Sequence, residues 1–181
     1  MDLSGPNSQM RHCNFSLPEI EDILILQGWN QIFSILDLKK AFHQQPLHPD
    51  SRHITSTYTH FGVYQWKVNV MGLMKASQQF QKMIEDRLKE VRDVAKPYVD
   101  EILIGTRVAP GENLIEAHEK HLRRVLQVLK REKFVVEPSK SILFTTSVEF
   151  CGHVLENGTR RPAPGKLRVI EKWEAPRQSP S

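Results

Sequence analysis

The sequence predicts an α+β domain in which helices cover one face of an antiparallel sheet. Short apolar runs of strand character alternate along the chain with two long amphipathic segments, and turn-forming residues separate several of the runs. The chain has 181 residues, of which 39% are hydrophobic, enough for one compact domain with its own core. We therefore expect one domain over residues 17–175, a loose N-terminus over residues 1–16 and a tail over residues 176–181.

The first half of the chain predicts one short helix and three strands. A helix is expected over residues 17–24, opened by Pro18 and stopped by Gly28. Residues 32–36 are apolar and β-rich, which predicts a strand ending on Asp37. Apolar and polar side chains alternate on both sides of Phe61-Gly62, and this predicts a hairpin with strands at 54–58 and 63–70.

The second half predicts two amphipathic helices and further short strands. In residues 77–91 and 112–133, apolar side chains recur at helical spacing with charges on the opposite side. Between them, Tyr98-Val99 and residues 102–104 predict two strands folded about an acidic turn. Four more strands are expected at residues 134–136, 141–144, 148–150 and 153–155.

Charge and cysteine usage restrict the class of protein only loosely. Lys and Arg number 25 against 21 Asp and Glu, so the net charge of +4 fits a nucleic-acid binder and an ordinary protein equally. Cys13 and Cys151 form no CxxC pair, no signal-like apolar stretch follows Met1, and the apolar run at 23–26 is far shorter than the ~20 residues of a membrane span. We expect an intracellular protein, cytoplasmic or nuclear, neither secreted nor membrane-bound.

Three carboxylates occupy positions where burial is costly. Asp37 ends one apolar strand, and Asp100 with Glu101 interrupts another. An antiparallel sheet can place a strand-end acid beside a hairpin-turn acid, and such a pair with room for phosphate is the protein share of a Mg²⁺ site. The alternative is a solvated acidic turn, with Asp37 capping the segment that follows. Spacing alone leaves both interpretations open.

Five blocks in order resemble the reverse transcriptases of gypsy-type long-terminal-repeat retrotransposons. FSILDLKKAFHQ at 33–44 resembles the first catalytic motif, and FGVYQW at 61–66 with MGLMKASQQFQ at 71–81 is similar to the next block. YVDEILI at 98–104 stands where the family has its aromatic-x-Asp-Asp box. The later blocks are HEKHL at 118–122 and VEFCGHV at 148–154. Five ordered blocks between residues 17 and 176 are far more specific than one tetrapeptide.

The resemblance implies a reverse-transcriptase palm of ferredoxin-like topology with partial fingers. It also implies an RNA-directed DNA polymerase, part of a Pol polyprotein that carries RNase H as well, which adds dNTPs to a primer 3′-hydroxyl on an RNA or DNA template. Asp37 and Asp100 would hold two Mg²⁺ ions, or Mn²⁺ in their place, with the Leu38 carbonyl as a further ligand. Glu101 completes the catalytic acids by the same resemblance.

Further roles follow from the resemblance position by position. Phe42 would be the steric gate that excludes a 2′-hydroxyl, and Lys140 would stabilise or protonate the leaving pyrophosphate. The full set of nucleotide-binding residues is Leu38, Lys40, Ala41, Phe42, Met71, Gly72 and Lys140, with the backbone amides around Lys40 and Ala41 cradling the triphosphate. The primer grip would be formed by Phe150, Cys151, Gly152 and His153.

Each assignment has a structural alternative. Phe42 and Met71 are also typical core residues, and Lys140 is also a typical solvated lysine. The basic residues of the long helix fit phosphate contacts and a solvated face equally; they are Arg123, Arg124, Lys130, Arg131 and Lys133. His118 and His121 are expected at the surface or in packing. The pairs His12-Cys13 and Cys151-His153 lack the ligand spacing that predicts zinc.

The chain also departs from the family pattern. Glu101 replaces the second aspartate of the box and displaces the carboxylate by ~1.5 Å, and a misplacement of that size costs on the order of 10²-fold in rate. Residues 74–77 read MKAS where the family usually has Thr-Asn-Ala-Pro. The sequence contains no counterpart of the basic fingers segment, the connection or RNase H, so we expect low or no activity. The alternatives are therefore an active palm, an inactive retroelement-derived remnant that at most binds nucleic acid, and an unrelated α+β scaffold.

Overall fold

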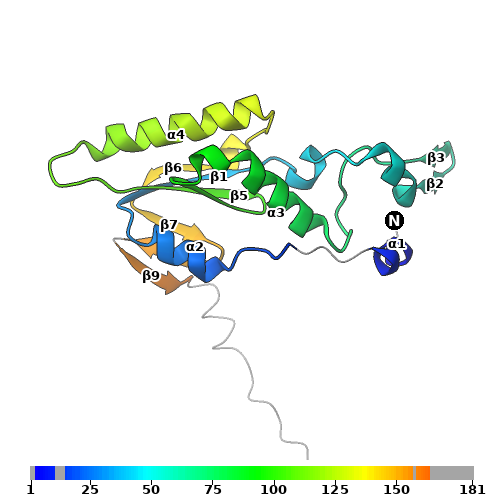
Figure 1. Ribbon diagram of the computed structural model, residues 1–181, viewed down its shortest axis with the longest axis horizontal. Helices are drawn as coiled ribbons and strands as arrows, with labels where there is room; N and C mark the ends of the chain where they lie inside the picture. Colours follow the sequence, from blue (N-terminus) through cyan, green and yellow to red (C-terminus); the bar gives the residue numbers. More distant parts are fainter. Residues whose placement is uncertain (1–2, 11–14, 157, 164–181) are drawn as a thin grey trace, which may run out of the picture.

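A four-stranded antiparallel sheet forms the centre of the molecule. The computed structural model describes residues 3–10, 15–156 and 158–163, and Figure 1 shows the sheet between two layers of other elements. The strands lie in the order β4-β5-β1-β6. Their bounds are β1 Ile32–Asp37, β4 Ala95–Tyr98, β5 Glu101–Thr106 and β6 Ile142–Thr145.

Strand β1 is the central element, because it pairs with β5 on one side and β6 on the other. Successive side chains of a strand point to opposite faces, and β1 and β5 are buried along almost their whole length. Leu36 and Ile102 belong to one core cluster, whereas Ile35 and Leu103 belong to the other. Apolar residues on both faces explain why the sequence of β1 is a continuous apolar run and not an alternating one.

Two helices cover the first face, as the sequence predicts. They are α3 (Ala76–Arg87), followed by the short η3 (Lys89–Val91), and α4 (Leu114–Arg131). Phe80 and Ile84 of α3 and Val125 and Leu129 of α4 are almost fully buried in one cluster with the sheet. Asn113 caps α4 by accepting the N–H of Glu116, as N-cap asparagines commonly do.

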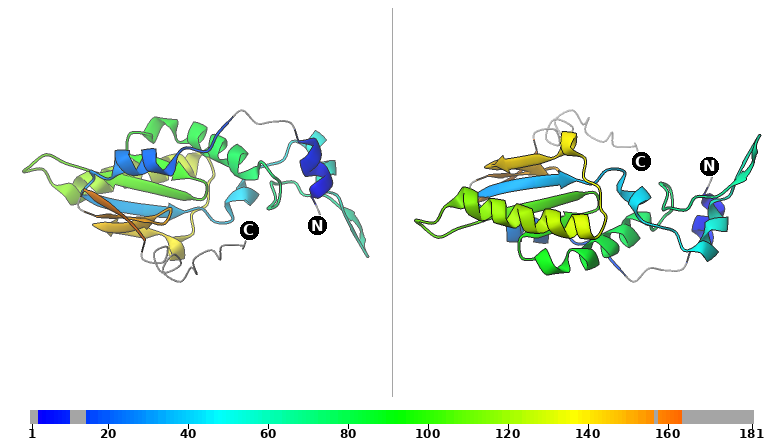
Figure 2. Two further views of the ribbon diagram at one scale, coloured as in Figure 1. Left: turned by 90° about the horizontal axis from the view of Figure 1, so that it is seen from below. Right: turned by 90° about the horizontal axis from the view of Figure 1, so that it is seen from above.

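The second face is covered as well, which the prediction of helices on one face did not include. Helix α2 (Ile20–Gln27) lies there with a three-stranded sheet of β7 (Ser147–Phe150), β8 (His153–Glu156) and β9 (Thr159–Pro162). Figures 1 and 2 show α4 and this second layer on opposite sides of the central sheet. Ile23 and Leu24 of α2 pack with Val148, Phe150 and Leu155 of the small sheet.

An extended arm, residues 41–75, projects from the end of β1 (Figure 1). It contains η1 (Ala41–Gln44), η2 (Pro49–Thr55) and a hairpin of β2 (Thr57–Thr59) and β3 (Gly62–Tyr64). The hairpin is shorter than predicted, because the chain after Tyr64 turns back and forms a bridge between Val68 and Pro46.

Two further predictions differ from the structure. The chain at 134–136 forms no strand: Lys133 has a φ of 63°, the N–H of Phe134 bonds the carbonyl of Leu129, and Val136 makes only a single bridge to Leu38. A short helix, α1 (Ser4–Gln9), lies in the segment expected to be loose, because buried Leu3 packs against Val70 and Leu73. The tail at 176–181 lies outside the described residues. In the part of the chain that is described, no helix combines the length and the apolar character needed to cross a bilayer.

Candidate active site

The sheet brings the two predicted catalytic aspartates together. In the pairing of β1 with β5, Asp37 lies directly opposite Glu101. The two-residue turn of Val99 and Asp100 joins β4 to β5, and the N–H of Leu38 donates to the carbonyl of Asp100 over 2.8 Å. The end of β1 and the acidic turn therefore lie side by side, although 63 positions separate Asp37 from Asp100 in the sequence.

A cavity of about 350 Å³ opens at this point, and most of the predicted nucleotide-binding residues line it. Its lining consists of Asp37, Leu38, Lys39, Lys40, Ala41, Phe42, Met71, Asp100, Glu137 and Lys140. Gly72 does not belong to this lining; its carbonyl accepts the side-chain amide of Asn7, and its φ of 97° is one that glycine tolerates.

Burial and neighbouring acids raise the pKa of two acidic groups of the site, Asp37 and Glu101. Burial raises the pKa of Asp37 above its ordinary value; the Lys140 ammonium opposes this shift, and Asp100 and Glu137 add to it. Burial also raises the pKa of Glu101, and Asp100 and Asp37 raise it further. Carboxylates arranged in this way repel one another, and a cation among them relieves the repulsion.

The wall of the cavity formed by residues 37–44 is held by hydrogen bonds that the sequence motifs do not reveal. The Gln44 side chain donates to the carbonyls of Lys39 and Val135 and accepts the N–H of Val135 over 2.8 Å. Lys39 forms an ion pair of 3.1 Å with Glu137. Lys40 has a φ of 49°, so the backbone turns sharply between β1 and η1. These contacts tie the loop after β1 to the segment that precedes β6.

Gln81 of α3 holds the acidic turn from beneath. Its side chain is fully buried; the amide oxygen accepts the N–H of Val99 over 2.6 Å and the amide nitrogen donates to the carbonyl of Pro97 over 2.9 Å. Val99 has a φ of 52°, which is unfavourable for a β-branched residue and needs support from its surroundings. Gln81 is thus a site residue to which sequence reasoning assigned no role, since only the spatial contact identifies it.

The predicted primer grip lies next to the acidic turn. A second cavity of about 410 Å³ is lined by Ile20, Phe42, Tyr98, Val99, Asp100, Glu101 and Cys151. Cys151 and Gly152 form the turn between β7 and β8, and His153 follows at the start of β8. Phe150, the other predicted member, is completely buried and meets the ring of Tyr98 edge-on at 6.5 Å, so it supports the turn from inside the core.

The donor set of the first cavity fits Mg²⁺. Within the described ranges, no group of three or more His, Cys, Asp or Glu side chains is placed to hold a metal ion; His12 and Cys13, whose spacing does not predict zinc, lie outside those ranges. Mg²⁺ in phosphoryl-transfer sites typically takes one or two carboxylates, with the remaining ligands supplied by substrate phosphates and water. Asp37 and Asp100, with backbone carbonyls beside them, provide that kind of incomplete set.

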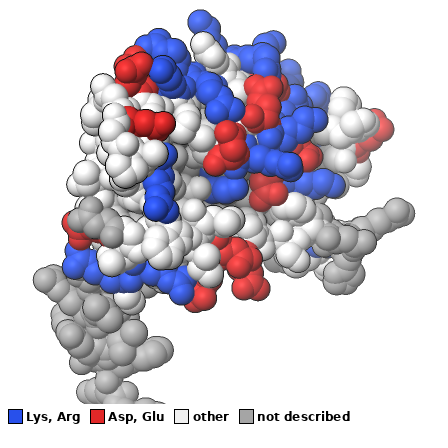
Figure 3. Space-filling model, turned by 60° about the vertical axis from the view of Figure 1, so that its left-hand side comes forward, with Lys and Arg blue, Asp and Glu red and all other residues white. Residues whose placement is uncertain are grey.

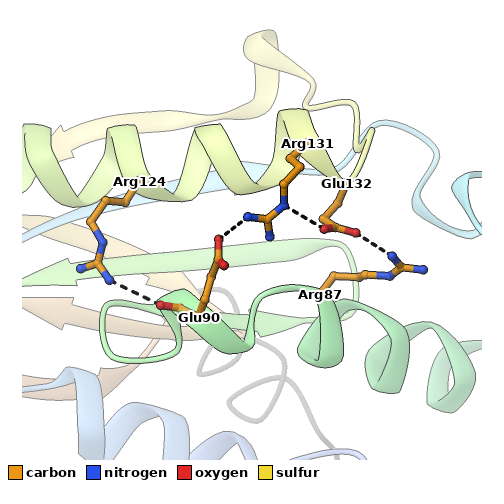
Figure 4. A network of polar contacts seen from close by, with 5 residues as sticks. All are labelled: Arg87, Glu90, Arg124, Arg131 and Glu132. Carbon is orange, nitrogen blue, oxygen red and sulfur yellow. Dashed lines mark hydrogen bonds and ion pairs between the residues drawn. The ribbon is translucent and has the colours of Figure 1, made fainter.

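The basic side chains of α4 are mostly neutralised within the chain. Arg123 pairs with Glu119, and Arg124 bonds Asp93 and the carbonyl of Glu90. Figure 4 shows Arg131 between Glu90 and Glu132, with Arg87 on the far side of Glu132. Acidic and basic side chains accordingly intermingle on the face in Figure 3. The pairing favours the solvated-face interpretation of these residues over phosphate contacts.

His118 is a core residue and not a surface residue. It has no exposed surface and joins Ser34 of β1 to Thr106 of β5 through hydrogen bonds of 2.8 and 2.7 Å. Burial, with a smaller contribution from His121, lowers the pKa of His118 to about 4, so the ring is neutral at physiological pH. Its role is structural, since it fastens α4 to the sheet.

Comparisons with known proteins agree with this arrangement. Residues 5–155 match the reverse transcriptase (RNA-dependent DNA polymerase) family. The chain is 30% identical to the enzymatic polyprotein of Cauliflower mosaic virus (strain Strasbourg) over 159 residues, which are 88% of this chain and 22% of that protein. It is 30% identical to the retrovirus-related Pol polyprotein from transposon gypsy of Drosophila melanogaster over 163 residues, 90% of this chain and 15% of that protein.

Solved structures show the same fold. The foamy viral protease-reverse transcriptase dRH in complex with double-stranded DNA has a TM-score of 0.84 at 23% identity, covering 97% of this chain and 30% of that one. The foamy viral protease-reverse transcriptase in complex with an RNA/DNA hybrid gives a TM-score of 0.80 over 97% of this chain and 23% of that one. The chain spans about a fifth of the length of the viral polyproteins it resembles. On the family match, the motif order and the fold, this chain belongs to the reverse transcriptase family.

Proposed function

We propose that this chain catalyses RNA-directed DNA synthesis, adding dNTPs to a primer 3′-hydroxyl as a domain of a retroelement Pol protein. The observation that carries the proposal is the single cavity that unites Asp37, Asp100, Phe42 and Lys140. These residues come from three separate segments of the chain, around positions 37–42, 100 and 140. Their convergence next to the proposed primer-grip turn is what nucleotidyl transfer requires, since both substrates must meet at the same carboxylates.

Asp37, Asp100 and the Leu38 carbonyl are the groups that would hold the metal ions. When bound, two Mg²⁺ ions supply activation of the attacking hydroxyl and neutralisation of charge on the triphosphate. Burial raises the pKa of Asp37 and the Lys140 ammonium opposes this rise, so this ammonium, which lines the same cavity, is close enough to balance phosphate charge as well.

Phe42 is positioned as the sugar gate in this proposal. Its ring lines both cavities and meets the buried ring of Phe80 edge-on at 5.8 Å. A ring braced in this way resists displacement by an extra hydroxyl group, which favours dNTPs over ribonucleotides. Met71 would line the same pocket from the arm, where its side chain is 71% exposed.

The charge distribution of the arm supports a nucleic-acid template as partner. The arm, residues 41–75, has three Lys or Arg residues and one acid, a net charge of +2. The basic residues are Arg52, Lys67 and the buried Lys75, the acid is Asp50, and Lys39 and Lys40 directly precede the arm. A local excess of this kind attracts the phosphate backbone through counterion release.

The test is primer extension on RNA and DNA templates with Mg²⁺ or Mn²⁺. Asp37→Asn and Asp100→Asn should each lower the extension rate on the order of 10²-fold or more, because each removes charge at the reacting centre. Asp50→Asn is the matched control, since the Asp50 side chain is 90% exposed and lies outside both cavities.

One observation favours a second candidate, a retroelement-derived remnant that binds nucleic acid without synthesis. Glu101 stands where the family has aspartate, so the acid group is altered at the proposed catalytic centre. Nucleic-acid binding without synthesis is the correct function if the natural chain extends primer no faster than Asp100→Asn with either metal but still binds template–primer.

A further inference from the structure

The third carboxylate of the site borders a different cavity from Asp37. Asp37 lines the first cavity and Asp100 lines both, whereas Glu101 lines only the second, together with Cys151. Glu101 is half-buried, and the backbone N–H of Cys151 stabilises its carboxylate. We infer that Glu101 is a positioning residue, whose carboxylate accepts a hydrogen bond from this N–H, links the acidic β4–β5 hairpin to the β7–β8 turn and holds that turn in place.

The turn that Glu101 contacts needs such support. Phe150 pairs with His153, which leaves Cys151 and Gly152 as a two-residue turn with φ values of 50° and 74°. Hairpin turns of this geometry favour glycine or asparagine at both positions, and a residue with a Cβ is strained in the first. The His153 ring lies 3.3 Å from the Cys151 carbonyl, so the same residue has polar contacts on both its carbonyl and its N–H.

The length of the glutamate side chain suits it to this contact. Residue 101 lies in the β1–β5 ladder opposite Asp37, one position after the turn. One more methylene than aspartate extends the carboxylate by ~1.5 Å, in the direction of the neighbouring small sheet. The substitution that separates this chain from the family box therefore creates a link between two hairpins, in addition to altering the acid group.

A second contact joins the same two hairpins. Tyr98, at the end of β4, meets Phe150 edge-on at 6.5 Å, and both residues pack in the second core cluster. An apolar contact below the turn and a charge-assisted hydrogen bond at the turn together limit movement of one hairpin against the other. The consequence for primer alignment rests on the proposed function; the link itself does not.

Amide hydrogen exchange followed by NMR tests the link without any need for catalysis. Glu101→Ala should raise the exchange rate of the Cys151 amide about tenfold or more, because a charge-assisted hydrogen bond is lost. Glu101→Gln retains an acceptor oxygen at the same reach and should stay within about threefold of the natural chain. Glu149→Ala is the matched control, since Glu149 is an exposed acid on the same hairpin, two residues before Cys151.

Three results would overturn the inference. The first is rapid, unprotected exchange of the Cys151 amide in the natural folded chain, which needs no variant to fold. The second is an unchanged rate in Glu101→Ala. The third is equal acceleration in Glu101→Gln and Glu101→Ala, which would assign the effect to charge and not to an acceptor within reach.

Primer extension separates this inference from the proposed function. If the natural chain does not extend primer, the proposed function fails and the exchange rates alone decide the link. If it does, Glu101→Ala should raise KM for template–primer by about fivefold or more with a smaller effect on kcat, and Glu101→Gln should lose less than Glu101→Ala. A fall in kcat for Glu101→Gln as large as that for Asp100→Asn would instead place Glu101 at the reacting centre and overturn the positioning role.

Discussion

The central sheet and the arm differ most in how far their side chains are buried. Five of the six residues of β5 are buried, whereas β2 and β3 contain no buried residue. The hairpin of the arm instead exposes large apolar side chains, with Tyr58 of β2 at 85% and Phe61 of the turn at 90%. Figure 1 shows the arm extending away from the layered part of the molecule.

This difference explains where the candidate catalytic groups are located. Asp37 and Asp100 lie at the ends of strands that are packed on both faces, so the core determines their positions. The arm contributes Ala41, Phe42 and Met71 to the cavity; Ala41 and Phe42 pack against the core next to β1, whereas Met71 is largely exposed. Rigid elements therefore carry the chemistry that depends on distance, and the part of the arm beyond η1 carries basic and apolar surface, where position matters less.

The largest expected effect is in the core. Phe80 has no exposed surface and meets the rings of Phe42 and Phe134 edge-on at 5.8 and 6.4 Å. Phe80→Ala should lower the free energy of unfolding by ~3–5 kcal/mol, because it leaves a cavity between α3 and the sheet. Phe61→Ala in the arm is the matched control and should change it by less than ~0.5 kcal/mol. Urea unfolding measures both, and similar losses in the two variants would show that the arm is packed as tightly as the core.

The elements with a strong local pattern are the ones that the sequence predicted well. The apolar run of β1 ending on Asp37 and the periodicity of α4 both correspond to observed elements. In contrast, β9 has no apolar alternation; it is a strand because Thr159 to Pro162 pair with β8. Helix α1 likewise depends on contacts that Leu3 and Asn7 make with residues more than 60 positions away.

The candidate site divides in the same way. Residues to which the resemblance assigns a role could be named from the sequence, and eight of them meet in the first cavity: Asp37, Leu38, Lys40, Ala41, Phe42, Met71, Asp100 and Lys140. Gln44 and Gln81 could not be assigned roles, because what they do depends on backbone groups of distant segments. Phe150 stays a predicted member of the primer grip, and the sequence did not reveal that its side chain is enclosed in the core.

The second expected effect concerns pH and the attachment of α4 to the sheet. His118 is held neutral in the fold with a pKa of about 4, against 6.5 in the unfolded chain. Between these values the unfolded chain binds a proton that the folded chain does not, so stability falls as pH decreases from about 6.5 to about 4. Burial also lowers the pKa of His121, which adds an effect of the same sign.

The size of the His118 contribution follows from the shift. The difference between the folded and unfolded pKa of His118 corresponds to about 3 kcal/mol in the free energy of unfolding, reached once the pH lies below both values. Urea unfolding of the natural chain and of His118→Asn across pH 4 to 7 measures it as the difference between the two pH profiles. Parallel profiles would contradict a neutral buried ring. His60→Asn in the arm is the control, since residue 60 is exposed.

The smallest expected change in stability comes from loss of the contact between α3 and the acidic turn. This loss has the most direct consequence for the site. Gln81→Leu replaces the amide by an apolar side chain and leaves the Val99 N–H and the Pro97 carbonyl without their partner, at a cost of ~1–3 kcal/mol. Gln79→Leu, an exposed position of the same helix, should cost less than ~0.5 kcal/mol.

Once released, the strained Val99 backbone can relax and displace Asp100, which should slow primer extension by on the order of 10²-fold. Adding Val99→Gly to Gln81→Leu should recover ~1 kcal/mol of stability, because glycine adopts the positive φ without strain. It should not recover the rate of primer extension, because a flexible turn does not hold the Asp100 carboxylate in place. Recovery of the rate together with the stability would show that Gln81 stabilises the fold without positioning Asp100.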